Sequence, residues 1–142
     1  MKMNAHTTFV TALLLAGCAV MDTRDAPPPG HVQCTRGGSD ICVIEVTVNS
    51  CTSIVARPND VWVPPNDSGD VMWRINNPGQ WKFTGNGITF RNPHQDFSNP
   101  RGGGGVVFRW NNAHSVKNKS HKYTIHVTDG RQTCDHDPSI MN

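Results

Sequence analysis

The residues best suited to chemistry lie near the C-terminus, in the segment CDHDPSIM at positions 134–141. This segment offers a thiolate from Cys134, an imidazole from His136 and a thioether from Met141, in that order. A blue-copper centre uses two imidazoles and a thiolate in one plane with a weak axial thioether, because Cu(I) favours soft sulfur and Cu(II) favours nitrogen. His94, in ITFRNPHQDF at positions 88–97, is the candidate for the second imidazole. Cys134 has a second interpretation, since it can instead form half of a disulfide.

The number of cysteines favours the disulfide. Besides Cys18 near the N-terminus, the chain contains Cys34, Cys42, Cys51 and Cys134. An even number of cysteines is typical of disulfides in an exported domain, whereas a thiolate at Cys134 would leave an odd set of three. We expect Cys34 to pair with Cys42 across a turn-rich spacer and Cys51 to pair with Cys134, while a bridge from Cys34 or Cys42 to Cys134 stays open. The sequence thus predicts two disulfides and no cofactor, with copper as the alternative.

Patterns that signal catalysis are mostly absent. There is no Gly-x-Ser-x-Gly elbow and no His-Glu-x-x-His motif, and Glu45 is the only glutamate, which excludes a catalytic glutamate pair. The segment Arg-Gly-Gly-Gly-Gly at 101–105 precedes a strand pattern instead of a helix, so we interpret it as a flexible loop or sheet edge and not as a phosphate cradle. His126 and Asp129 are too close in sequence, with no nucleophile beside them, to form a triad. Scattered histidines are more often surface residues than ligands, although a looser copper or zinc site stays open that would use His94, His114, His121, His126 or His136. We expect that the protein is not an enzyme.

Alternating apolar residues predict β-strands. Apolar side chains occupy every second position in the segments 42–48, 71–75, 106–110 and 123–127. A period of two puts one face of each strand in a core. Most of the four tryptophans and five phenylalanines fall on these inward positions, so we interpret them as core residues, although the sequence does not assign a phase to Trp62.

Turn signals complete the prediction of fold class. Asn86 lies between two glycines and suits the positive φ angles of a tight turn, so we expect a hairpin that joins 81–84 to 88–90. No segment has a sustained helical period, and 13 glycines and 10 prolines interrupt the chain as the loops of a sandwich do. The sequence therefore predicts an all-β, Greek-key-type β-sandwich of about seven strands, stapled by disulfides.

The N-terminus has the organisation of an export signal. Met1–His6 carries one lysine, and Thr7–Leu15 is an apolar stretch too short to span a bilayer as a helix. The stretch ends in Leu-Ala-Gly-Cys at positions 15–18, which resembles a bacterial lipobox. The resemblance implies cleavage before Cys18 and acylation of both its sulfur and its new amine, and several acyl chains anchor a protein firmly. Because Ala19 is not the aspartate that commonly retains lipoproteins at the inner membrane of Gram-negative bacteria, the resemblance implies the outer membrane, facing the periplasm.

These features divide the chain into three parts. Residues 1–17 form the signal peptide, and residues 18–30 form the acylated cysteine and a proline-rich tether that cannot bury enough apolar surface to fold. Residues 31–142 have the size of one small domain, for which we expect a single β-sandwich. The formal net charge is +2, with 13 Lys/Arg against 11 Asp/Glu and no run of one sign. This charge lacks the surplus needed to bind nucleic acid.

Parts of the globular segment resemble small uncharacterised exported proteins with a cupredoxin-like sandwich; an immunoglobulin-like sandwich is the other form of the expected fold class. The order His94, Cys134, His136, Met141 is that of the ligands in plastocyanin-like cupredoxins, which implies electron transfer or copper handling as the alternative function. In that family at least two residues separate the ligand cysteine from the next histidine, whereas only Asp135 does so here. The C-terminus instead matches the tail pattern C..DP.I.N of the exported proteins, at Cys134, Asp137, Pro138, Ile140 and Asn142. That pattern leaves His136 and Met141 unconstrained and favours the disulfide.

The sequence leaves three functional hypotheses. The one we favour is a lipid-anchored envelope protein that binds another envelope protein or a surface polymer without catalysis. The second is a copper-binding cupredoxin, which predicts a free thiol at Cys134. The third is a hydrolase whose catalytic groups converge in a cleft only in the folded chain.

Overall fold

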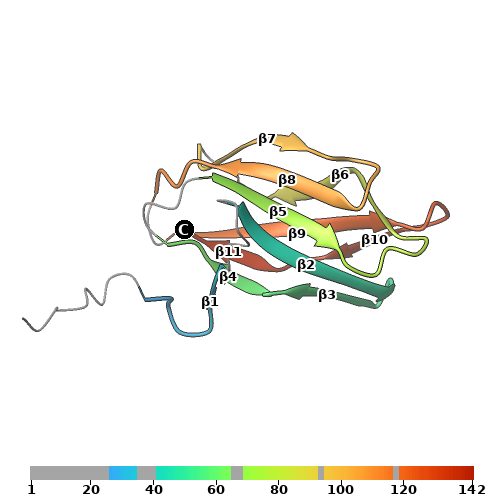
Figure 1. The fold of residues 1–142 in the computed structure, drawn as a ribbon, viewed down its shortest axis with the longest axis horizontal. Coiled ribbons are helices and arrows are strands. Elements are labelled where there is room, and N and C mark those ends of the chain that lie inside the picture. Colours follow the sequence, from blue (N-terminus) through green and yellow to red (C-terminus); the bar gives the residue numbers. More distant parts are fainter. Residues whose placement is uncertain (1–25, 35–40, 65–68, 93–94, 117–118) are drawn as a thin grey trace, which may run out of the picture.

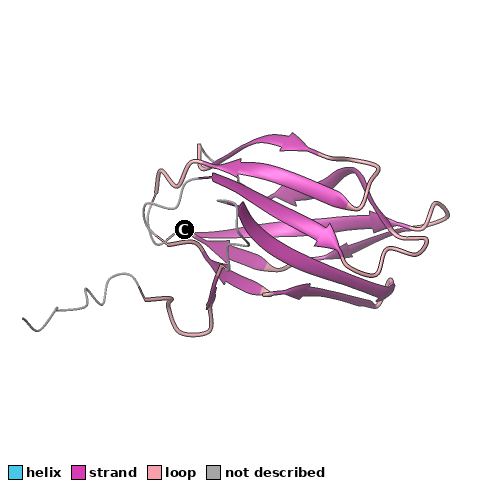
Figure 2. Ribbon diagram, viewed as in Figure 1, coloured by secondary structure: helices cyan, strands magenta, loops and turns pink. Residues whose placement is uncertain are grey.

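The computed structural model describes residues 26–34, 41–64, 69–92, 95–116 and 119–142. Every regular element in these residues is a strand (Figure 2). In chain order the strands are β1 (Val32–Gln33), β2 (Ile41–Ser50), β3 (Ser53–Arg57), β4 (Asp60–Trp62), β5 (Gly69–Ile75), β6 (Lys82–Phe90), β7 (Phe97–Arg101), β8 (Val107–Asn112), β9 (Ser120–Thr128), β10 (Thr133–His136) and β11 (Ser139–Met141). This part of the chain contains no helix with the length and apolar character that crossing a bilayer requires.

The strands form two mixed sheets that pack as a β-sandwich (Figure 1). One sheet has the order β3-β2-β5-β8-β7, and the other has the order β1-β4-β11-β9-β10. Strand β6 joins the second sheet on the opposite edge of β9 from β10, because both strands pair with Ile125 and Val127. The predicted all-β sandwich is confirmed, but the described residues form eleven strands instead of about seven, since several short strands carry no alternating pattern.

The predicted hairpin at Asn86 is wrong. Residues 82–90 form one continuous strand, β6, which pairs with β9 far along the chain. The register passes from Phe83 opposite Val127 to Ile88 opposite Ile125, so the intervening residues of β6 bulge out of the ladder. Gly87 is needed there for close packing and not for a turn, because a Cβ on it would lie 2.6 Å from Phe83 Cβ.

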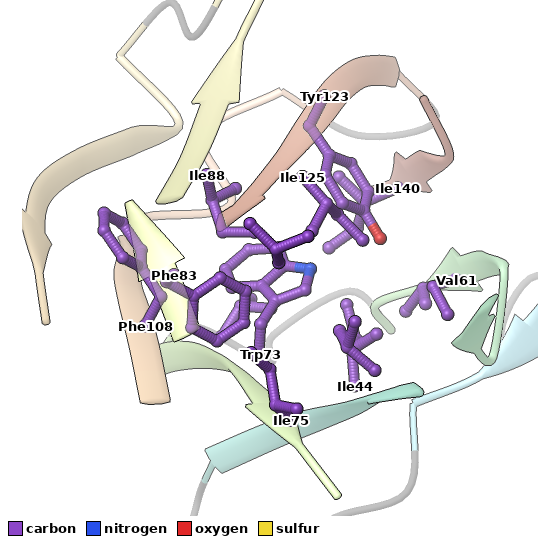
Figure 3. Packing of buried hydrophobic residues seen from close by; sticks show 14 of the residues in the cluster. Ile44, Val61, Trp73, Ile75, Phe83, Ile88, Phe108, Tyr123, Ile125 and Ile140 are labelled. Carbon is purple, nitrogen blue, oxygen red and sulfur yellow. The ribbon is translucent and has the colours of Figure 1, made fainter. Parts of the chain in front are cut away.

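The core lies between the sheets and uses the predicted inward positions (Figure 3). The alternation in 42–48, 71–75 and 123–127 is confirmed, because every second residue of β2, β5 and β9 is buried. Trp73 lies at the centre and meets Tyr123 edge to face, with ring centroids 5.3 Å apart at 66°, a favoured geometry for aromatic pairs. Trp62 is buried as well, together with both of its neighbours. The prediction is weakest in 106–110, where Phe108 is buried but Val106 precedes β8 and is exposed.

Two disulfides pin both ends of β2 to the other sheet. Cys42 near the start of β2 bonds Cys34, which directly follows β1, and Cys51 just beyond its end bonds Cys134 in β10. The preferred pairing of the four cysteines is therefore confirmed. Since β1 and β10 belong to one sheet and β2 to the other, each bond staples the sandwich across its core.

The C-terminal segment is part of the sheet. Strand β11 lies between β4 and β9, where Ile140 is fully buried. The buried side-chain amides of Asn142 and Asn112 exchange two hydrogen bonds, of 2.8 and 3.2 Å. These contacts give Ile140 and Asn142, two positions of the tail pattern, a packing role.

Candidate functional site

A groove opens along the side of the sandwich where edge strand β6 faces β7 and β8. It has a volume of about 390 Å³ and is called the edge groove below. Its described lining combines aromatic, aliphatic, polar and glycine residues and contains no charged side chain; it consists of Gly85, Asn86, Ile88, Thr89, Pro100, Gly102, Gly103, Phe108 and Trp110. Such a mixture of apolar surface and a few polar groups is typical of ligand sites.

Bulges on both edge strands shape the groove. In β6 the bulge follows Phe83, and in β7 the register shifts between Ser98 and Arg101, where Asn99 adopts a positive φ of 55°. A bulge removes residues from the ladder and re-aims their side chains, which is why bulges are frequent beside functional sites. Strands β6 and β7 are therefore both irregular where they line the edge groove.

The glycine run after β7 closes one end of the edge groove. Its backbone crosses to the other sheet, where Gly104 N donates to Phe83 O at 3.1 Å and Phe83 N donates to Gly105 O at 2.8 Å. The approach is so close that a Cβ on Gly103 would lie 2.6 Å from Gly85 O. The run is therefore a specific contact between the sheets and not only the flexible loop or sheet edge that the sequence suggested.

A hydroxyl, an imidazole and a carboxylate form a hydrogen-bonded series across three strands beside the groove. Thr89 Oγ1 lies 2.8 Å from His126 Nε2, and His126 Nδ1 lies 2.7 Å from Asp135 Oδ1. The order of atoms is that of a nucleophile, a general base and an orienting acid. His126 is 23% exposed and Asp135 is 60% exposed. Asp129, the partner weighed from the sequence, instead accepts backbone hydrogen bonds from Arg131 and Gln132.

A buried ionisable pair, Asp96 and His121, lies at the end of the sandwich where β9 begins. Asp96 Oδ2 lies 3.1 Å from Nε2 of His121, and both side chains are buried. Asp96 Oδ1 accepts hydrogen bonds from Ser115 N, Ser115 Oγ and Val116 N at 2.5–3.0 Å. Burial alone raises the pKa of the Asp96 carboxyl, but these hydrogen bonds and His121 outweigh burial and lower it below its usual value. His121 is thus not the surface residue expected from the sequence.

The proposed copper ligands do not converge in the described structure. Cys134 is bonded to Cys51 and has no thiolate to offer. His136 lies opposite Ile125 of β9 and Met141 lies opposite Ser120, and five positions along a strand correspond to about 17 Å. No group of three or more His, Cys, Asp or Glu side chains in the described residues has a geometry that could hold a metal. His94 falls outside these residues, as does the predicted lipidation site Cys18.

No known family model matches this chain, and no curated protein sequence is detectably similar to it.

Proposed function

We propose that this chain is a lipoprotein of the bacterial cell envelope, anchored through Cys18 at the outer membrane, whose sandwich binds another envelope molecule without catalysis. The lipobox-like segment at 15–18 supports the anchor. The two disulfides that join the sheets suit an oxidising compartment. We propose no cofactor. A copper site would lack the thiolate of Cys134, which is bonded to Cys51, and His136 and Met141 pair with distant positions of β9.

The edge groove is the observation that carries the binding role. Its described lining has no charge, and two of its residues, Asn86 and Thr89, offer an amide and a hydroxyl beside the partly exposed ring of Trp110. Arg101, next to the groove, is engaged by Asp70 in an ion pair of 2.6 Å. The groove therefore suits an extended, uncharged segment of a protein or surface polymer.

Site-specific photo-crosslinking in living bacteria tests this role. A photoreactive amino acid at Asn86, in the groove, is compared with the same group at Thr52, which is exposed in the turn between β2 and β3. We expect a defined adduct from position 86 that is absent from position 52. No adduct at position 86, or the same adducts from both positions, would contradict a binding role of the groove.

The series Thr89–His126–Asp135 favours one second candidate, a hydrolase. In an acyl transfer, His126 Nε2 would take the hydroxyl proton while Thr89 Oγ1 bonds to the carbonyl carbon of an ester. The imidazolium would give this proton to the departing alkoxide, and water would then release the acyl group from Thr89 as a carboxylic acid. Asp135 would hold the imidazole in the required tautomer.

Ester turnover by the full chain distinguishes the two candidates. Hydrolysis requires that Thr89→Val and His126→Gln abolish turnover, while Thr89→Ser keeps it and Asp129→Asn, at a carboxylate outside the series, leaves it unchanged. If all four variants match the parent chain, or if none shows turnover, the series is a structural feature of the sheet and the binding role stands alone.

A further inference from the structure

Two positive side chains face each other across strands β6 and β9 at the end of the sandwich held by Asp96. Phe90 pairs with Tyr123 in the antiparallel ladder, and Arg91 N donates to Lys122 O at 3.1 Å. Arg91 and Lys122 are consequently cross-strand neighbours. Like charges directly opposite each other destabilise a sheet, so this arrangement needs a compensating interaction.

The described residues do not supply that compensation through an ion pair. Arg74 pairs with Glu45, and Asp70 is shared by Arg101 and Arg109, whereas no ion pair in this part of the chain involves Arg91, Lys119 or Lys122. Two carboxylates lie in the neighbourhood of Lys122. The pKa of Asp60 is lowered by a hydrogen bond from the Ser139 hydroxyl and, more weakly, by Lys122. Asp137 lines a hollow together with Arg91 and Lys122, but it forms no ion pair with either side chain within the described residues.

The three cations surround a hollow of about 170 Å³, called the basic hollow below. Its described lining contains no carboxylate; it consists of Arg91, Asn92, Lys119, Ser120, His121 and Lys122. A neighbouring hollow of about 220 Å³ shares Arg91 and Lys122 but also includes Asp137, whose negative charge disfavours an anion there. The basic hollow is therefore the better anion site of the two.

Contacts of His121 and of the Lys119 carbonyl fix the backbone of the basic hollow. His121 is buried against Asp96 and lies edge-on to Phe97, with ring centroids 5.0 Å apart. Asn142 N donates to Lys119 O at 3.1 Å, which ties the strand leading into β9 to the C-terminal residue. Lys119 and Lys122 thus project from a segment that is fixed at both ends.

The basic hollow also lies on the side of the sheet where the tether enters. Val32 pairs with Val61, Val61 with Ile140, and Ile140 with His121, so these four residues form one row across the sheet. Three strand spacings place His121 about 14 Å from Val32. Figure 1 shows β1, the C-terminus and the start of β9 at the same end of the sandwich.

We propose that the basic hollow binds a phosphate group, namely that of an anionic phospholipid at the membrane surface to which the tether leads. A guanidinium fork and two ammonium groups match the geometry and charge of a phosphate, and a serine hydroxyl and an asparagine amide supply further donors. The assignment of this phosphate to a membrane lipid rests on the proposed anchoring at Cys18, whereas the binding of a phosphate group does not.

The test uses the full chain with Cys18→Ser, which removes the acylation site and keeps every other residue. Arg91→Gln/Lys122→Gln is compared with Lys82→Gln/Arg131→Gln, which removes the same two charge types from exposed positions at the other end of β9. Binding is measured with inorganic phosphate and with phosphatidylglycerol vesicles at fixed ionic strength. We expect the first variant to lose at least about tenfold in affinity for both probes, the control to lose less than about twofold, and phosphate to displace the chain from vesicles.

Each alternative outcome rejects part of the proposal. Equal losses in both variants, or no binding of either probe, would overturn the basic hollow as a site. Binding of phosphate without binding of vesicles would exclude the lipid and leave a site for a soluble phosphate. Failure of the anchor would appear separately, as unmodified Cys18 in the parent chain.

The melting temperature of Arg91→Gln/Lys122→Gln distinguishes a binding role of the two cations from a role in stabilising the fold. Without phosphate, Arg91→Gln/Lys122→Gln relieves the repulsion, and we expect the melting temperature to rise by about 1 to 4 °C. Added phosphate should stabilise the parent chain and leave the variant unchanged. A variant that melts earlier than the parent would show that the two cations serve the fold.

Discussion

The two disulfides should contribute very unequally to stability. In the loop-entropy model, a bond stabilises by restricting the unfolded chain, and the effect grows with the logarithm of the loop it closes. Cys51–Cys134 spans 83 positions and Cys34–Cys42 spans only 8. At 25 °C these loops correspond to about 4.5 and about 2.5 kcal/mol. Because a small domain is stable by only about 5 to 15 kcal/mol, loss of the longer bridge should remove much of the margin.

Urea unfolding of Cys51→Ala/Cys134→Ala and Cys34→Ala/Cys42→Ala measures this difference. Each variant is compared with the parent chain under oxidising conditions, by tryptophan fluorescence and by circular dichroism. We expect the variant that lacks Cys51–Cys134 to be less stable than the variant that lacks Cys34–Cys42 by about 2 kcal/mol. When the parent and both variants are measured in reductant, neither variant should be less stable than the parent. Equal losses, or a larger loss for the short loop, would refute the entropic reasoning and point to contacts within each bridge.

Three further predictions concern the site residues. Asp96→Ala should destabilise the fold by about 3 to 5 kcal/mol at pH 7, because it removes the acceptor that buried His121 and three further donors share. Folding lowers the pKa of Asp96, so the stability that its carboxylate contributes is complete above about pH 4 and is lost as the pH falls through the lowered pKa. The difference in free energy of unfolding between variant and parent should therefore narrow in acid. A constant gap from pH 7 to pH 2 would contradict this. Gly103→Ala should cost about 1 to 3 kcal/mol by forcing two backbones apart, whereas Gly105→Ala, whose new Cβ would meet no atom within 4 Å, should change stability by less than about 0.5 kcal/mol; similar losses would exclude a specific contact at Gly103. Added Cu(II) should give no intense visible band, because Cys134 is bonded to Cys51; a blue colour would show that this bond is open.

The sequence predicts the long central strands well and the short edge strands poorly. Alternation in β2, β5 and β9 reflects burial of one face, which a local pattern records. Strands such as β1, β4 and β11 have only two or three residues and exist because neighbouring strands offer hydrogen bonds. The prediction for the Asn86 segment failed for a related reason, since its glycines also fit a bulge in one strand and only the distant partner β9 decides between a bulge and a turn.

The candidate sites were less accessible from the sequence than the fold. Thr89, His126 and Asp135 come from three strands whose register no local pattern fixes, and Arg91 faces Lys122 for the same reason. The copper hypothesis shows the opposite error. His136 in β10 and Met141 in β11 are near in sequence, but they pair with positions of β9 that are far apart. The even number of cysteines correctly predicted that Cys134 is in a disulfide, because this prediction depends on composition and not on strand register.

Intact mass of the chain expressed in a Gram-negative bacterium, measured with and without thiol alkylation, shows directly whether Cys18 is acylated and whether the other four cysteines are bonded. We expect a species that lacks residues 1–17, carries acyl groups on Cys18 and takes up no alkylating reagent until it is reduced, after which Cys34, Cys42, Cys51 and Cys134 all react. A chain that retains residues 1–17 with an unmodified Cys18, or in which Cys134 reacts before reduction, would contradict a lipid-anchored, disulfide-stapled envelope protein.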